Sequence, residues 1–194
     1  FGLFGTAWAV MQFIFSPILG ALSDRFGRRP VVLLSNCGLA LDYVLMALAP
    51  DLWWLFAGRV ISGLSSATVP TAFAYITDVT PAGQRAAKFG MIGAAFGLGF
   101  VLGPAVGGVL GGVDPRLPFW LAAAMRLLNG LYGLLVLPES LPREQRMAFE
   151  WRRANPIGSL KLLRSHSELS GLAVSVFLID LAHVVLPSVW VLYA

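Results

Sequence analysis

Long apolar segments separated by short polar connectors dominate the hydrophobic pattern of the chain. Each apolar segment holds roughly twenty residues, the length of helix that crosses the ~30 Å hydrocarbon core of a bilayer. Because lipid offers the backbone no hydrogen-bond partners, such segments are stable there only as helices. The pattern therefore predicts membrane-spanning helices over six ranges: 1–20, 31–49, 53–77, 87–111, 118–137 and 168–194.

Positive charge gathers in alternate connectors of this pattern. Most of the 14 Lys and Arg residues lie in or beside the connectors 21–30, 78–86 and 138–167. The positive-inside rule places these connectors in the cytoplasm and predicts a multi-pass protein of the inner (plasma) membrane. The net charge of +4 follows from this topology and requires no nucleic-acid partner. Soluble domains have ~25% charged residues, whereas this chain has 12% charged and 57% hydrophobic residues.

The fourth predicted helix contains helix-disrupting residues at regular intervals. In water, each interior glycine would cost a helix roughly 0.5–1 kcal/mol and a proline about 3 kcal/mol. In lipid the helix persists, the glycines permit close approach of a second helix, and the proline sets a bend. The residues of this motif are Gly90, Gly99, Gly103, Pro104, Gly107 and Gly108.

The first connector, GALSDRFGRRP, is predicted to be a tight turn. We expect Gly20 to permit close helix contact as the first span ends, and Gly27 to allow the chain to reverse. Asp24 faces several arginines, and a solvated loop with a local salt bridge of ~0–1 kcal/mol is the alternative interpretation. The candidate residues are Gly20, Asp24, Arg25, Gly27, Arg28 and Arg29.

Two ionisable residues lie at matching depth in neighbouring predicted spans. Asp42 precedes the outer end of the second span, and Arg59 follows the outer start of the third. At 1.5 Å per residue both lie about 10 Å below the outer surface, so they can pair. One interpretation is that Asp42 attracts protons or a cationic drug while Arg59 adjusts its proton affinity. The alternative is a fixed ion pair that holds two helices together.

Other polar residues inside the predicted spans leave alternatives open. Arg126 lies at similar depth, and we expect it either to share Asp42 or, preferably, to snorkel to the outer surface or to have a structural role. Asp180 and His183 stand three residues apart on one helix face near mid-membrane. Such a pair can exchange a proton near neutral pH, although a mutually satisfied pair or a polar cavity lining is the alternative.

These motifs resemble the major facilitator superfamily, and more narrowly its tetracycline-resistance branch of drug/proton antiporters. The first connector matches the loop motif between the family's second and third helices, and Arg59 in GRVISG matches an arginine of the fourth. The glycines of 90–108 match the antiporter motif with every interval kept. The resemblance covers the whole chain as the family's second to seventh helices. It implies an all-α, polytopic transmembrane helix bundle that is part of a major facilitator fold.

The resemblance also implies how the chain is divided. Residues 1–137 would form five spans of the N-terminal six-helix bundle, and 138–167 a cytoplasmic linker. Residues 168–194 would form the first helix of the C-terminal bundle. Because Phe1 and Ala194 both lie in apolar sequence, we expect the chain to be an internal piece of a longer protein.

Roles for individual residues follow from the same resemblance. Asp24 and Arg28, together with Asp78, resemble the charged latch that holds the cytoplasmic side closed. The 90–108 motif resembles the hinge and seal where two bundles press together. Gln12 matches a residue that lines the pathway, although a plain hydrogen bond between helices is an equal alternative. Close members carry a neutral polar residue in place of Arg126, and they lack Asp180 and His183.

The expected function is proton-coupled export of a hydrophobic drug by alternating access, with a tetracycline as one candidate. The protein is expected not to be an enzyme, and to use no cofactor or bound metal site; protons are the coupling ion, and a divalent cation can travel with the substrate. Its partners are the lipid bilayer, a small drug-like substrate and protons, and the oligomeric state is left open. The alternatives are a major facilitator exporter of another drug or metabolite, and a non-transporting membrane sensor or truncated remnant.

Overall fold

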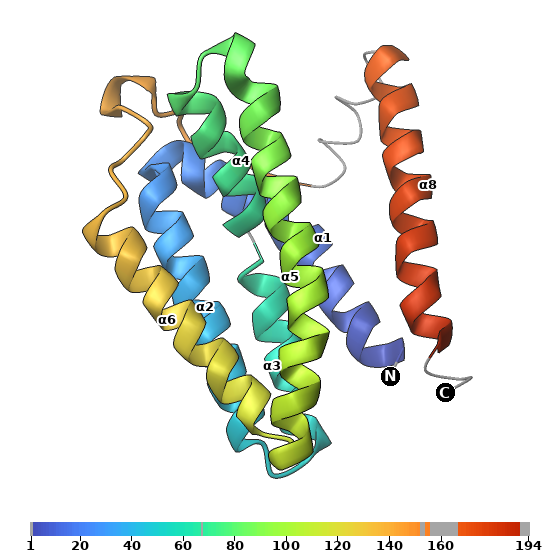
Figure 1. The fold of residues 1–194 in the computed structure, drawn as a ribbon. Helices are drawn as coiled ribbons and strands as arrows, with labels where there is room; N and C mark the ends of the chain where they lie inside the picture. The colour runs from blue at the N-terminus through green and yellow to red at the C-terminus, as the bar shows by residue number, and fades with distance from the viewer. Residues whose placement is uncertain (1, 67, 152–153, 156–166, 191–194) are drawn as a thin grey trace.

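The computed structural model describes residues 2–66, 68–151, 154–155 and 167–190. Within these residues the regular structure is helical without any strand, so the predicted all-α class is confirmed. Figure 1 shows the helices in chain order. They are α1 (Gly2–Phe26), α2 (Arg28–Leu48), α3 (Leu52–Leu64), α4 (Thr68–Val79), the 3₁₀ helix η1 (Ala82–Gln84), α5 (Arg85–Val113), α6 (Leu117–Leu135), the 3₁₀ helix η2 (Arg143–Gln145) and α8 (Ser167–Trp190).

Helices long and apolar enough to cross a membrane are present throughout the first 113 residues. By length and composition, four such helices occur among the described residues: Gly2–Phe26, Arg28–Leu48, Leu52–Val79 and Ala82–Val113. Helix α6 is outside this set, because its 19 residues include the polar Arg126 and Asn129. In α8 a shorter apolar stretch, Ser170–Ile179, is found.

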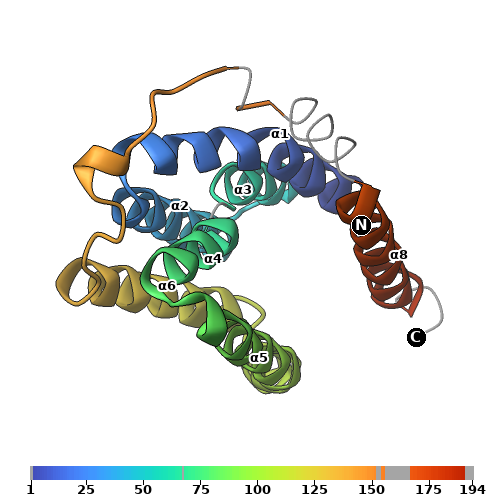
Figure 2. The same cartoon turned by 90° about the horizontal axis from the view of Figure 1, so that it is seen from above.

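Helix α2 lies at the centre of the packed group. It packs most extensively against α6, and also against α1, α3 and α4. Figure 1 shows α5 in front of these helices, and it contacts α6 as well as α4 and η1. The view from above in Figure 2 shows α8 to the side of the group formed by α1 to α6.

The third predicted span is present as the spanning segment Leu52–Val79, but its helix is interrupted within the span. Helix α3 ends at Leu64 and α4 begins at Thr68. Pro70 has no backbone N–H and cannot donate to the carbonyl of Ser66, which removes one helical hydrogen bond at this point. The Ser66 hydroxyl instead donates to the carbonyl of Gly63 at 2.8 Å.

The first connector is much shorter than predicted. Residues 21–26 continue α1, and α2 begins at Arg28, so the loop predicted over 21–30 is reduced to Gly27. Gly27 has a φ of 107°, a conformation that favours glycine. A Cβ at Gly20 would meet no described atom within 4 Å, so the close helix contact expected there is not made within the described chain and stays a prediction. The chain passes Gly20 within an uninterrupted helix and reverses seven residues later.

Side chains hold the turns at both ends of the group. At the end of α4, Arg85 donates to the carbonyls of Thr80 (3.1 Å) and Thr77 (3.0 Å). At the opposite end, the Asp51 carboxylate accepts hydrogen bonds from the backbone N–H groups of Trp53 (3.0 Å) and Trp54 (3.2 Å). Asp51 is therefore the N-cap of α3, a role in which a carboxylate stabilises the helix start.

Candidate functional site

Arg28 joins three helices at the end of the bundle where α1 meets α2. Its guanidinium Nη1 donates to the Asp24 carboxylate at 2.5 Å and to the Ser23 hydroxyl at 2.7 Å. Its Nε donates to Asp78 Oδ2, on α4, at 3.1 Å. We call Ser23, Asp24, Arg28 and Asp78 the Arg28 cluster. The structure thus brings together the three residues predicted to form a latch, and that role stays a prediction.

The Arg28 cluster is only partly shielded from solvent. The exposed fractions of the side chains are 13% for Arg28, 22% for Asp78 and 41% for Asp24. Ion pairs that keep some hydration are weak, whereas fully buried pairs are costly to break. The geometry is therefore compatible with a contact that opens and closes repeatedly.

The other two arginines of the motif lie apart from the cluster. Arg29 Nη2 donates to the backbone carbonyl of Leu134, near the end of α6. The guanidinium of Arg25 lies over the ring of Phe26, 5.1 Å from the ring centroid. Of the three arginines in the motif, Arg28 alone is paired with the predicted carboxylates among the described residues.

Glu139 is a site residue that sequence reasoning missed. Its carboxylate accepts hydrogen bonds from the backbone N–H groups of Arg28 (2.8 Å) and Arg29 (3.3 Å), at the start of α2. A carboxylate here satisfies free helix donors and faces the positive end of the helix dipole. A Cβ at Gly27 would collide with the Glu139 carboxylate, so a side chain at this turn would displace the capping group.

The segment around Glu139 is tied to the Arg28 cluster at further points. The Ser140 hydroxyl donates to Asp78 Oδ2 at 3.2 Å, and the backbone N–H of Met147 donates to the carbonyl of Asp24 at 3.1 Å. Arg146 lies 4.0 Å from the Glu139 carboxylate. The available signal was an acidic residue between two prolines, Pro138 and Pro142, directly after a predicted span.

Asp42 is buried between α2 and α3, with 1% of its surface exposed. A Cβ at Gly58 would lie 2.6 Å from Asp42 Oδ1, so the carboxylate packs directly against the backbone of α3. Within the described residues, Asp42 Oδ1 has no hydrogen-bond partner. Two side chains of α3 interact with the Asp42 carboxylate: Arg59 through its charge and Ser62 through its hydroxyl.

The direct ion pair suggested between Asp42 and Arg59 is not formed in the described structure. The two residues lie on neighbouring helices as predicted, but no N···O contact within 4.0 Å joins them. Arg59 Nη2 instead donates to the sulfur of Met46 at 3.0 Å. Met46 is one helical turn beyond Asp42 on α2, so the guanidinium lies displaced by about one turn along that helix.

Gln12 lies where α1 meets α3. A Cβ at Gly63 would lie 2.8 Å from the carbonyl of Trp8 and 3.3 Å from the backbone nitrogen of Gln12. The absence of a side chain at Gly63 is therefore what lets α3 approach α1 so closely. Sequence reasoning did not single out Gly63 or Gly58.

The antiporter motif is helical as predicted, but the expected close contact is not made within the described chain. Helix α5 runs from Arg85 to Val113 with Pro104 inside it. A Cβ at any of the motif glycines would meet no described atom within 4 Å. These glycines are Gly90, Gly99, Gly103, Gly107 and Gly108. Helix α5 packs on α4 and α6 through other residues, so a tight partner for this face stays a prediction.

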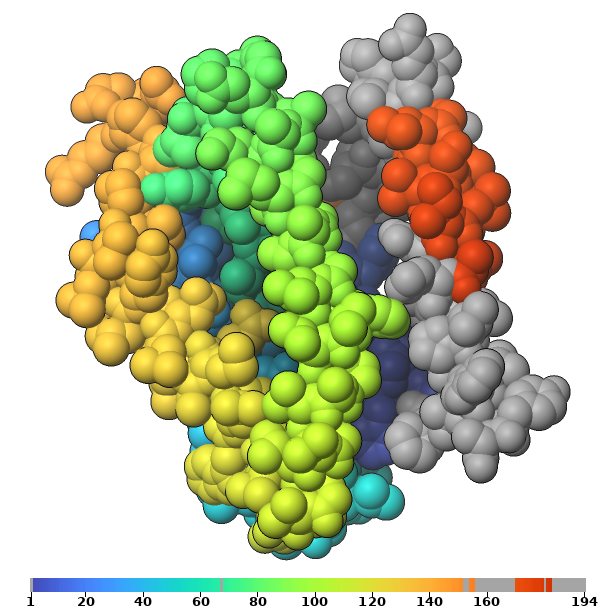
Figure 3. Space-filling model, viewed as in Figure 1, coloured from blue at the N-terminus to red at the C-terminus, as the bar shows by residue number. Residues whose placement is uncertain are grey.

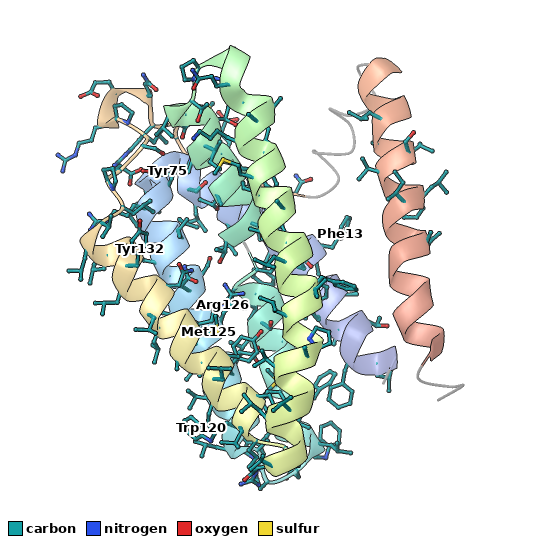
Figure 4. The ribbon with its side chains drawn as sticks, in the orientation of Figure 1. Phe13, Tyr75, Trp120, Met125, Arg126 and Tyr132 are labelled. Carbon is teal, nitrogen blue, oxygen red and sulfur yellow. The ribbon has the colours of Figure 1, made fainter. Side chains whose placement is uncertain are left out.

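Arg126 makes a hydrogen bond to a neighbouring helix, in keeping with the structural alternative expected for it. Its Nη1 donates to Asn36 Oδ1 on α2 at 3.5 Å, and no ion pair to Asp42 is formed among the described residues. Figure 4 shows the side chain pointing from α6 toward α2 and α5 rather than along α6 to the bundle end. Asn129 Nδ2 also donates to Asn36 Oδ1, at 3.1 Å. We call Asn36, Arg126 and Asn129 the Arg126 cluster; sequence reasoning missed its two asparagines.

Asp180 and His183 both lie in helix α8. Their side chains are outside the part of the chain that the structure describes. Their proposed pairing stays a prediction.

Apolar helices of spanning length, with charged groups at one end and buried between helices, define a polytopic α-helical membrane protein. The family model described as Major Facilitator Superfamily matches residues 1–193. The chain belongs to the Major Facilitator Superfamily.

Known proteins similar to the chain include several tetracycline resistance proteins. The class C protein of Escherichia coli is 42% identical over 193 residues, which cover 100% of this chain and 48% of that protein. The class B protein of Escherichia coli is 48% identical over 131 residues, covering 68% of this chain and 33% of that protein. The chain thus spans about half the length of the curated relatives that it matches end to end.

A solved structure supports the fold. The human organic anion transporter MFSD10 (TETRAN) aligns with a TM-score of 0.72 and 36% sequence identity. The alignment covers 79% of this chain and 36% of that protein. The predicted partial major facilitator bundle is therefore confirmed.

Proposed function

We propose that the complete protein is a proton-coupled antiporter that exports a hydrophobic drug by alternating access. Family membership and the tetracycline resistance relatives support drug efflux as the activity. Under this proposal the protein is not an enzyme, and protons are the coupling ion. A tetracycline, with a divalent cation travelling alongside it, is one candidate substrate.

The observation that carries the proposal is the buried, incompletely hydrogen-bonded carboxylate of Asp42. A carboxylate inside a membrane protein is costly unless it is paired or has a function. Here one carboxylate oxygen has no hydrogen-bond partner among the described residues. The charge of Arg59 interacts with the carboxylate, although the two side chains form no direct ion pair. Such a group can bind and release a proton as its surroundings change.

The proposal assigns the Arg28 cluster to the cytoplasmic side of the inner membrane. Protonation of Asp42 and opening of the Arg28 cluster would then be linked through α2, which begins at Arg28 and contains Asp42. The exposed glycine face of α5 would meet the other half of the transporter. In the same proposal the bilayer, the drug and protons are the partners.

A protein of the same fold could also export a different class of substrate. The printed title of MFSD10 describes an organic anion transporter, and its 36% identity to this chain is similar to that of the tetracycline resistance proteins. An exporter of another drug or metabolite is therefore the alternative. A membrane sensor is distinguished by binding without flux.

The test is drug-driven proton movement in proteoliposomes that contain the complete protein. Addition of a tetracycline under a proton gradient should move protons for the wild type, and Asp42→Asn should abolish this exchange while expression and folding persist. Asn keeps the size of Asp but cannot ionise. Asp51→Asn is the matched control, because Asn also caps a helix, and it should exchange like the wild type.

Wild-type exchange by Asp42→Asn would rule out the coupling role. Loss of the folded protein in this variant, judged by gel filtration, would assign Asp42 to packing instead. Binding of drug with no proton movement by the wild type would favour the sensor.

A further inference from the structure

The segment that follows α6 binds helices α2 and α4 through two adjacent residues. Glu139 accepts hydrogen bonds from the backbone N–H groups of Arg28 (2.8 Å) and Arg29 (3.3 Å) at the start of α2. Ser140, the next residue, donates its hydroxyl proton to Asp78 Oδ2 at the end of α4 (3.2 Å). In Figure 3, atoms of this segment (orange) lie next to those of α4 and the α4–α5 turn (green). Helices α2 and α4 are therefore joined across one peptide bond.

One oxygen of Asp78 is shared by Ser140 and Arg28. Arg28 Nε donates to Asp78 Oδ2 at 3.1 Å, and the Ser140 hydroxyl donates to the same atom. A hydroxyl carries a single donor, and Ser140 directs it at this carboxylate. Because Ser140 is anchored through Glu139 to the helix that begins at Arg28, its hydroxyl holds Asp78 from a position that is fixed relative to the guanidinium.

The segment is fixed more firmly to α1 and α2 than to α4. In addition to the two hydrogen bonds of Glu139, the backbone N–H of Met147 donates to the carbonyl of Asp24 on α1 at 3.1 Å. Leu141, between these points, is buried with 7% of its surface exposed. Adjacent Cα atoms stay ~3.8 Å apart, so Ser140 cannot follow α4 outward while Glu139 remains on α2. If α4 moves away, the bond from Ser140 to Asp78 is the one that breaks.

Helix α4 is able to move separately from α3. The helix is interrupted between Leu64, where α3 ends, and Thr68, where α4 begins. Pro70 removes a helical hydrogen bond here, and prolines are common sites of helix bending. Helix α4 has only 12 residues, and Asp78 lies in its last turn. It is therefore a short helix with a break at one end and, at the other, a carboxylate held by Arg28 and Ser140.

We infer that Ser140 is a positioning residue of the latch: its hydroxyl keeps Asp78 on Arg28 and so sets how readily α4 moves away from α2. This inference rests on the proposed transport function and assigns a means of regulation to the Arg28 cluster. Each hydrogen bond contributes modestly to stability because water replaces it when it breaks, so the contact can open and close repeatedly. The segment after α6 thereby adds to the stability of the closed arrangement only.

A distance between two spin labels measures the movement of α4 directly. The labels are attached at Gly83→Cys, in the α4–α5 turn, and at Glu144→Cys, in η2, with Cys37 replaced by Ser. Both positions are exposed, and a Cβ at Gly83 would meet no described atom within 4 Å. Electron paramagnetic resonance of the complete protein in detergent should give a short distance for the closed arrangement and a longer one for the open arrangement.

Three serine variants test the role of the hydroxyl. Ser140→Ala should raise the ratio of the long-distance to the short-distance population about tenfold, as expected for loss of one hydrogen bond to a charged group. Ser140→Thr keeps a hydroxyl and should retain the wild-type ratio. Ser175→Ala is the matched control, because it removes a serine hydrogen bond in α8, to the carbonyl of Gly171, and should leave the ratio unchanged.

A double substitution distinguishes positioning of Asp78 from general packing. In the Asp78→Ala background the hydroxyl has lost its acceptor, so Ser140→Ala should cause no further change in the ratio. Should Ser140→Ala not fold, Ser140→Val, which has the shape of Thr without the hydroxyl, replaces it and should give the same rise. An unchanged ratio in the variant that lacks the hydroxyl would overturn the inference. A full additional effect in the Asp78→Ala background would overturn it as well.

The distance measurement uses neither drug nor a proton gradient, which keeps this inference distinct from the antiporter proposal. A tenfold rise in the ratio without proton exchange by the wild type would support the role of Ser140 and reject the antiporter. Drug-driven exchange with an unchanged ratio in Ser140→Ala would reject the role of Ser140 and leave the antiporter standing.

Discussion

Two acidic side chains illustrate how differently a carboxylate is used in this protein. Glu139 satisfies backbone donors at the start of α2 and lies near Arg146. Asp42 is buried against Gly58 with one oxygen unpartnered in the described residues. Glu139 is therefore stabilising as an anion, whereas Asp42 lies in surroundings that solvate an anion poorly.

Replacing Glu139 tests its role as the helix cap. Glu139→Gln keeps the shape but removes the charge, and we expect a loss of about 1–2 kcal/mol from weakened hydrogen bonds and helix-dipole stabilisation. Thermal unfolding of the complete protein in detergent measures this loss. Glu144→Gln, in the nearby η2 helix, is the control and should melt like the wild type. Identical melting of both variants would argue against the cap.

Glycines serve different purposes in different helices. Gly63 allows α3 to touch the backbone of α1, whereas the glycines of α5 have open space around them in the described chain. A motif of regularly spaced glycines predicted the helix of α5 but not which glycines make contacts inside the bundle. Single glycines such as Gly63 carried no comparable pattern in the sequence.

One pair of substitutions compares the role of glycine in α3 with its role in α5. Gly63→Leu should destabilise the protein by about 1–3 kcal/mol or more, because its side chain overlaps Trp8 and Met11 of α1. Gly103→Leu should leave thermal stability close to that of the wild type but block drug transport, since α5 would lose its close approach to the other half of the transporter. Unfolding temperatures and flux in proteoliposomes separate the two effects. Equal destabilisation by both substitutions would contradict this division.

For the complete bundle, sidedness follows from where the turns lie. The α4–α5 turn is at the end that carries Arg28, and the α5–α6 turn is at the opposite end. With Cys37 replaced by Ser, an impermeant thiol reagent should label Gly83→Cys only from the cytoplasm and Pro115→Cys only from outside, as the charge pattern predicts. Labelling of both positions from the same side would contradict the topology.

Much of the architecture follows from hydrophobic pattern and motif spacing. The all-α class was predictable because segments of spanning length have one stable backbone form in lipid. The division of the third span was not predicted, although Pro70 signals it, because lipid-embedded helices often tolerate proline. The latch residues Asp24, Arg28 and Asp78 were identified through the family motif, and the structure brings them together.

Contacts between distant segments were not predictable from one sequence. The bond between Glu139 and Arg28, and the sharing of Asn36 by Arg126 and Asn129, depend on how α6 packs against α2. Depth estimates placed Asp42 and Arg59 on the same level, but rotation of each helix decides where a side chain points. That rotation directs Arg59 to Met46.

The carboxylate of Glu139 has a consequence for biosynthesis. It binds a backbone group 111 positions earlier in the chain. At a ribosomal rate of about 5–20 residues per second, the beginning of α2 emerges roughly 6–22 s before its capping carboxylate is made. A nascent chain halted before that point leaves unsatisfied amides at the start of α2. This turn is therefore completed only after translation has passed α6 and reached Glu139.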